Sequence, residues 1–111
     1  MQPINTMARQ GDVMLRRVDK MPDAVKPVER DNGRVVLAYG EVTGHSHALA
    51  SPRVAMFMDT GGAGGRYIRV QPGEAVALEH EEHSTILIEP GDYQVIQQTE
   101  YTPEAVRNVA D

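Results

Sequence analysis

The segment QPGEAVALEHEEHSTILIEPGDYQVIQQTEY, residues 71–101, contains short apolar stretches separated by turn-forming residues. Gln71-Pro72-Gly73-Glu74 and Pro90-Gly91-Asp92 are turn sequences, and HEEHS interrupts the pattern between them. Turn signals that recur about every eight to twelve residues are typical of an all-β sandwich or barrel. The predicted strands of this segment are AVALEH (75–80), STILIE (84–89) and YQVIQQTEY (93–101).

The same rhythm continues toward the N-terminus. Alternating apolar and polar residues predict strands at GDVMLRRVD (11–19), RVVLAY (34–39), RVAMFMD (53–59) and 67–70. We expect the chain to continue in extended form beyond Tyr39, with a bulge or corner at Gly40 or Gly44.

Three segments depart from the strand pattern. Residues 1–9 are predicted to form an N-terminal arm, and 20–33 a long loop that closes in an Asn32-Gly33 turn. Residues 102–110, with Thr, Pro and Glu at the start, are predicted to form a short helix. We therefore expect one all-β domain over residues 1–111. Its predicted architecture is a small barrel or jelly-roll-like sandwich of about eight short strands with a C-terminal helix.

Composition limits the chemistry. The chain of 111 residues has no cysteine, which excludes disulfides, thiolate metal sites and cysteine nucleophiles. Its first residues lack the apolar core of a signal peptide, and no run approaches the roughly 20 apolar residues of a membrane span. The expected location is the cytoplasm, without membrane contact.

Charge and motifs exclude other functions. The formal net charge is −5 and the cations are scattered, which argues against nucleic acid as a partner. The glycine-rich TGGAGG (60–65) lacks the GK[ST] ending of a phosphate-binding loop. A GxSxG nucleophile elbow is also missing, which argues against a serine hydrolase.

All four histidines fall in two clusters, GEVTGHSHAL (40–49) and LEHEEHSTI (78–86). His45 and His47 are two residues apart, so on a strand they project from the same face and can share one ion. His80 and His83 are three apart, a spacing that suits a turn or a corner. On a regular strand only one of this second pair could join the first.

The histidine clusters predict a metal site. Neutral imidazole binds Zn, Cu, Fe and Ni, and with oxygen ligands also Mn, so the residues do not distinguish among these divalent transition metals. Glu79, Glu81 and Glu82 add nearby carboxylates. The leading hypothesis is a metal held by His45, His47 and His83 and completed by His80 or Glu82, with Glu82 or Glu81 as ligand or general base.

The hypothesis leaves open whether the protein is an enzyme. A metal that activates water or dioxygen would support hydrolysis or oxidation of a small-molecule substrate. The alternative is a non-catalytic β module that oligomerises or binds another protein, with the histidines as surface, interface or pH-sensing groups. STILIE has few edge charges, and an unpaired edge there would favour such a partner.

The HSH motif in a small, turn-rich β protein resembles the HxH motif of the cupins. That resemblance implies a jelly-roll barrel with a metal held by three histidines and a glutamate. GDVMLRRVD and GRVVLAYGEV are faintly similar to small co-chaperonin barrels. The whole chain, with RQGDV, HEEH and EYTPEAVR, is similar to short bacterial and phage proteins, a similarity that implies no activity.

Overall fold

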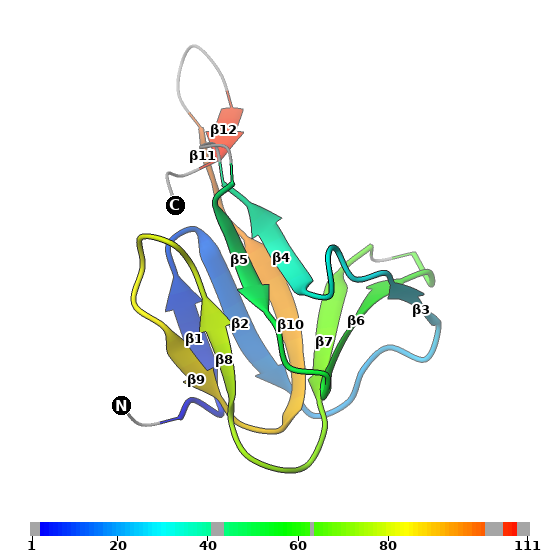
Figure 1. The fold of residues 1–111 in the computed structure, drawn as a ribbon. Coiled ribbons are helices and arrows are strands. Elements are labelled where there is room, and N and C mark those ends of the chain that lie inside the picture. Colours follow the sequence, from blue (N-terminus) through cyan, green and yellow to red (C-terminus); the bar gives the residue numbers. More distant parts are fainter. Residues whose placement is uncertain (1–2, 41–43, 63, 102–105, 109–111) are drawn as a thin grey trace.

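The computed structural model describes residues 3–40, 44–62, 64–101 and 106–108, and all regular structure within them is β (Figure 1). The prediction of an all-β fold is confirmed. The strands are β1 (Met7–Gln10), β2 (Val13–Val18), β3 (Val25–Val28), β4 (Val35–Tyr39), β5 (Ser46–Leu49), β6 (Val54–Asp59), β7 (Arg66–Val70), β8 (Val76–Glu79), β9 (Ile86–Ile88), β10 (Gly91–Gln97), β11 (Thr99–Tyr101) and β12 (Val106–Asn108).

Ten of these strands form two antiparallel sheets. One sheet has the order β1-β2-β10-β7-β6-β3 and the other β4-β5-β8-β9, while β11 and β12 pair separately. The smaller sheet lies across the larger one (Figure 1), and the two approach each other where β1 meets β9 and where β4 meets β6. The two sheets form a flattened sandwich, and the two layers contact each other along both side edges.

The core lies between the two sheets. Leu15 of β2 and Tyr93 of β10 face inward from the larger sheet, and Leu49, Leu78 and Ile88 face inward from the smaller one. Each is at most 1% exposed. Full burial of a side chain of this size contributes about 1.5–3 kcal/mol, so this layer accounts for the association of the sheets.

The Asn32-Gly33 turn forms as predicted. Both residues have positive φ, 53° and 79°, as a tight hairpin turn requires. Asp31 and Arg34 exchange both backbone hydrogen bonds across it, at 2.9 and 3.0 Å. The preceding segment is not the continuous loop that its prolines predicted, because Val25–Val28 pair with β6 as an edge strand, a position that tolerates Pro27.

The chain does not run on as one extended segment beyond Tyr39. β4 and β5 are antiparallel neighbours, and the Gly40 N–H donates to the His45 carbonyl at 2.9 Å. Gly44 has a φ of 88° on the return into β5. The register shift lies within β4, between Val36 and Ala38, instead of at a glycine.

The N-terminal segment is more ordered than an arm. Met7–Gln10 form β1, which pairs with β2. Ile4 makes a parallel bridge to Ile88 of β9, with hydrogen bonds from its own N–H to Leu87 O and from Glu89 N–H to its carbonyl. The β9 edge, which the sequence suggested was open to a partner, is therefore covered at this point by the protein's own chain.

The C-terminal helix prediction is wrong where it can be examined. Val106–Asn108 are extended and pair with Thr99–Tyr101. The rest of that prediction, residues 102–105 and 109–110, lies outside the described residues. Among the residues described, no helix is long and apolar enough to cross a membrane.

Candidate metal centre

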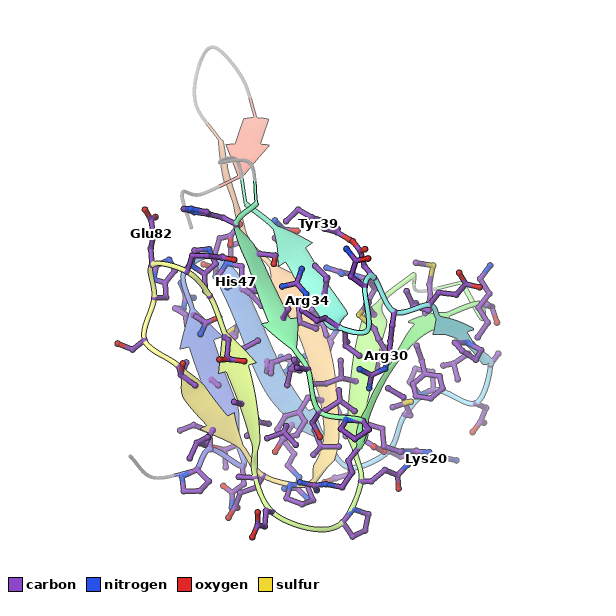
Figure 2. All side chains as sticks on the ribbon, viewed as in Figure 1. Lys20, Arg30, Arg34, Tyr39, His47 and Glu82 are labelled. Atoms are coloured by element: carbon purple, nitrogen blue, oxygen red, sulfur yellow. The ribbon has the colours of Figure 1, made fainter. Side chains whose placement is uncertain are left out.

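The β4–β5 hairpin carries the first histidine pair to one end of the sandwich. His47 lies on β5 and is completely buried, facing the interior on the same side as Leu49. His45 lies just before the strand, with 19% of its side chain exposed. Figure 2 shows His47 between β5 and the loop that joins β8 to β9.

The loop between β8 and β9 carries the second pair. His80 follows Glu79, the last residue of β8, and is 8% exposed. The loop turns over residues 81–83, so His80 and His83 are not constrained to opposite faces as they would be on a strand. Their ring centroids are 4.7 Å apart.

The two histidine clusters converge, although they are separated by more than thirty residues in sequence. The His80 ring is the centre of the group. Its centroid lies 4.3 Å from that of His47 and 5.6 Å from that of His45. His47 and His83 are nearly parallel, with centroids 5.8 Å apart. All four predicted histidines therefore belong to one cluster.

One hydrogen bond assigns the proton of a neutral His80. The Glu82 backbone N–H donates to His80 Nδ1 at 3.0 Å, so Nδ1 carries the lone pair. A neutral ring must then carry its proton on Nε2. To act as a metal ligand through Nε2, His80 must move that proton and give up the bond from Glu82.

The two candidate carboxylates differ in their relation to the cluster. Glu81 accepts a hydrogen bond from the Ser46 backbone N–H at 2.9 Å, which lowers the pKa of its carboxyl group. Ligand atoms of His45, His80 and Glu81 all lie within 4.8 Å of one another. The Glu82 side chain is 61% exposed (Figure 2), and its Oε2 lies 3.8 Å from His45 Nδ1. Glu81 is thus the better-placed carboxylate.

The sequence did not reveal a third contributor, the turn between β1 and β2. Gln10 and Asp12 are both buried, and both contact His47. Gln10 Oε1 lies 2.9 Å from His47 Nδ1, and Asp12 Oδ1 lies 3.3 Å from His47 Nε2. In sequence this turn has only the ordinary signature of a glycine between polar residues, so no local signal could have identified it.

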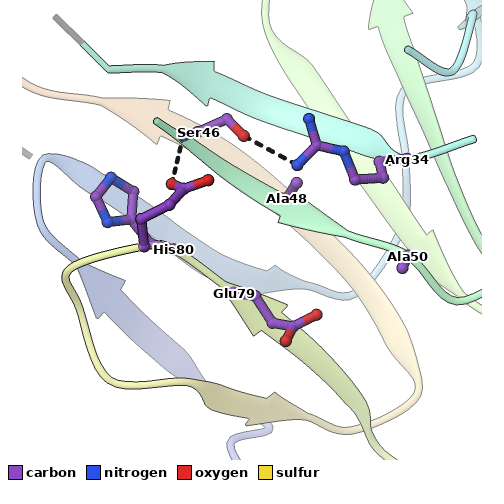
Figure 3. A pocket seen from close by; sticks show the side chains of 7 residues that line it. Arg34, Ser46, Ala48, Ala50, Glu79 and His80 are labelled. Carbon is purple, nitrogen blue, oxygen red and sulfur yellow. Dashed lines mark hydrogen bonds between the residues drawn. The ribbon is translucent and has the colours of Figure 1, made fainter. Parts of the chain in front are cut away.

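A pocket of about 280 Å³ opens beside the cluster, on the outer face of the smaller sheet (Figure 3). Small residues of β5 and its continuation form its floor, and Arg34 stands on the β4 side, where it donates to Ser46 Oγ at 3.1 Å. His80 belongs to both the pocket and the cluster. The lining residues are Arg34, Ser46, Ala48, Ala50, Glu79, His80 and Glu81.

Comparison with known proteins identifies the domain but no activity. Residues 9–98 match the family described as Domain of unknown function (DUF8820). The chain belongs to this family. No curated protein and no solved structure matches the chain significantly. The matched region contains all four histidines together with the β1–β2 turn.

Proposed function

We propose that this protein binds a divalent transition metal ion in the histidine cluster at the end of the sandwich. The observation that carries the proposal is the convergence of four imidazoles from two distant segments, with ligand atoms of His45, His80 and Glu81 already within 4.8 Å of one another. Imidazole nitrogen with carboxylate oxygen is a donor set for Zn, Cu, Fe, Ni or Mn.

Burial supports this interpretation over a solvated surface cluster. His47 is fully buried and His80 nearly so, and His45 Nδ1 and His83 Nε2 are buried atoms without a hydrogen-bond partner among the described residues. Buried polar atoms normally have partners, and an unsatisfied one costs about 1–3 kcal/mol. A metal ion would satisfy several of them at once.

The proton arrangement of His80 does not prevent binding. Moving its proton to Nδ1 sacrifices the hydrogen bond from Glu82, worth about 1 kcal/mol. Structural Zn²⁺ sites in small peptides bind with about 10–16 kcal/mol. The gain from coordination is therefore far larger than the cost of the rearrangement.

The pocket supports a small-molecule reaction at the metal. His80 and Glu81 line one part of it, so an ion held by these residues would be reached from the pocket. We propose metal-assisted hydrolysis or oxidation, with Glu81 as ligand or general base and the exposed Glu82 as the second candidate for that role. A centre of three histidines and a glutamate would also correspond to the cupin-like arrangement suggested by HSH.

The opposing reading is a non-catalytic module that acts through oligomerisation or a protein partner. Its main support from the sequence was an open STILIE edge, and Ile4 pairs with that edge. Metal binding is therefore the better-supported function.

Metal analysis of the untagged protein tests the proposal. We expect a stoichiometric transition metal in the purified chain, or stoichiometric uptake of added Zn²⁺ measured by calorimetry. His45→Ala and His80→Ala should lose it, while Glu74→Gln, an exposed carboxylate outside the cluster, should retain it. A wild-type chain that contains no metal, and whose melting temperature is unchanged by Zn, Cu, Ni, Mn or Fe, would contradict the proposal.

A further inference from the structure

We infer that the Gln10-Gly11-Asp12 turn is the third arm of the metal centre, with Asp12 as a ligand and Gln10 as the residue that orients His47. The inference rests on the proposed metal-binding function and adds to it a segment that neither histidine motif contains. It starts from the buried carboxylate of Asp12, which is only 4% exposed.

The two oxygens of Asp12 have different surroundings. Gln97 Nε2 donates to Oδ2 at 3.1 Å, and the Gln98 backbone N–H donates to the Asp12 carbonyl at 2.9 Å, so the residue is fixed in place. Oδ1 is buried and receives no hydrogen bond from any described residue. A buried carboxylate oxygen of this kind is stabilised by a positive charge beside it, either a metal ion or a protonated His47 at 3.3 Å, because transfer of a charge out of water is very unfavourable.

Gln10 determines which nitrogen of a neutral His47 carries the proton. Its Nε2 donates to Leu78 O at 3.0 Å and to Ser84 O at 2.9 Å, which uses both hydrogens of the amide. Oε1, 2.9 Å from His47 Nδ1, must therefore accept, and Nδ1 must carry the proton. A neutral His47 then directs its lone pair from Nε2, the arrangement that an outer hydrogen bond imposes on metal-binding histidines.

The atoms of Asp12 and His47 have the spacing of two ligands on one ion. Oδ1 and Nε2 are 3.3 Å apart, yet their geometry does not form a hydrogen bond. Two ligands that each lie ~2.1 Å from a tetrahedral ion are separated by ~3.4 Å. A cation between them would therefore satisfy the carboxylate without a large movement of either side chain.

Gly11 lets the turn approach the rings this closely. Its φ is 58°, and a Cβ at this position would lie 2.8 Å from His83 Nε2 and 3.1 Å from His47 Cε1. Any larger residue would have to displace an imidazole from the cluster. In this turn, Asp12 supplies the ligand oxygen, Gly11 leaves space for the rings, and Gln10 supplies the hydrogen bond that orients His47.

Zinc titration of an isosteric variant tests the role of Asp12. We expect Asp12→Asn to weaken Zn²⁺ binding by more than about 100-fold, beyond the ~10–100-fold that loss of an outer hydrogen-bonding partner causes. The matched control is Asp59→Asn. Asp59 also stabilises a turn, by accepting from Gly61 N–H at 2.7 Å, but lies outside the cluster, so its variant should bind normally.

Two further measurements separate a ligand from a structural residue. Metal-free Asp12→Asn should melt at or above the wild-type temperature, since it removes a buried carboxylate whose Oδ1 accepts no hydrogen bond, whereas a structural aspartate would lower that temperature. The visible spectrum of bound Co²⁺ at saturation should change in Asp12→Asn and stay constant in Asp59→Asn.

The role of Gln10 has its own spectroscopic test. Nitrogen-15 NMR of the metal-free wild type should show the His47 proton on Nδ1, and Gln10→Leu should yield a mixture of tautomers.

If the wild type binds Zn²⁺ and Asp12→Asn weakens that binding by less than 100-fold with an unchanged Co²⁺ spectrum, Asp12 is not a ligand. A wild-type chain that binds no metal would instead overturn the proposed function itself.

Discussion

His47 and Leu49 lie on the same strand, face the same interior and are both fully buried, but their surroundings differ completely. Leu49 pairs with Val35 and Leu78 and packs in the apolar core. His47, two residues earlier, contacts Gln10 and Asp12 and lies against the rings of His80 and His83.

The apolar contacts of Leu49 stabilise the fold, whereas the polar contacts of His47 belong to the candidate site. An apolar side chain at position 47 would extend the core and would place no polar side chain of its own in the interior. The protein instead places titratable groups at that end of the sandwich, where burial is unfavourable. Such local conflicts with stability are typical of functional sites.

The largest expected effect is on the apolar side of the comparison. Leu49→Ala removes a fully buried side chain and should lower the free energy of unfolding by about 2–5 kcal/mol, as measured by urea denaturation. The folded fraction should still bind metal with normal stoichiometry. If the fully folded Leu49→Ala variant bound no metal, the apolar core and the histidine cluster would not be independent of each other.

His47→Leu tests the polar side. Zn²⁺ at a hundred times its dissociation constant should stabilise the wild type by about 2.7 kcal/mol, and this increment should be absent from the variant. Metal-free, the variant should lose at most about 1–3 kcal/mol, because Gln10 Oε1 loses its partner. Melting curves with and without Zn²⁺ give both values, and an undiminished metal response would rule out His47 as a contributor.

Arg66 provides a polar contact that is structural. Its half-buried guanidinium donates from β7 to the Leu37 carbonyl of β4 at 2.6 Å, and burial lowers its pKa. Arg66→Met should destabilise the protein by about 1–3 kcal/mol through the unpaired carbonyl. The Zn²⁺ affinity should not change, in contrast to His47→Leu.

The smallest effects come from two glycines with positive φ. Gly33→Ala should cost about 1 kcal/mol, because the φ of 79° is unfavourable but a Cβ meets open space. Gly11→Ala has a similar backbone penalty and also presses on His83. Calorimetry should find weaker Zn²⁺ binding only in Gly11→Ala; equal binding in both variants would mean that the turn does not shape the centre.

Local features of the sequence were sufficient for the fold class and for part of the site. Alternating apolar residues and regularly spaced turns gave the all-β prediction, because the two-residue periodicity of strands and the φ preference of Asn-Gly are local properties. His45 and His47 were recognisable for the same reason. Where local preference competes with pairing, as at Val25–Val28 and Val106–Asn108, sheet partners decided the outcome.

By itself, the sequence determined that this is a β protein with histidines in two short clusters and no thiol to compete with them. Only the tertiary structure decided that the clusters meet, that Glu81 lies within 4.8 Å of ligand atoms of both His45 and His80, and that Gln10 and Asp12 contact His47. The physical reason is that strand register sets contacts between residues far apart in the chain, and a shift of one residue would turn His47 to the opposite face.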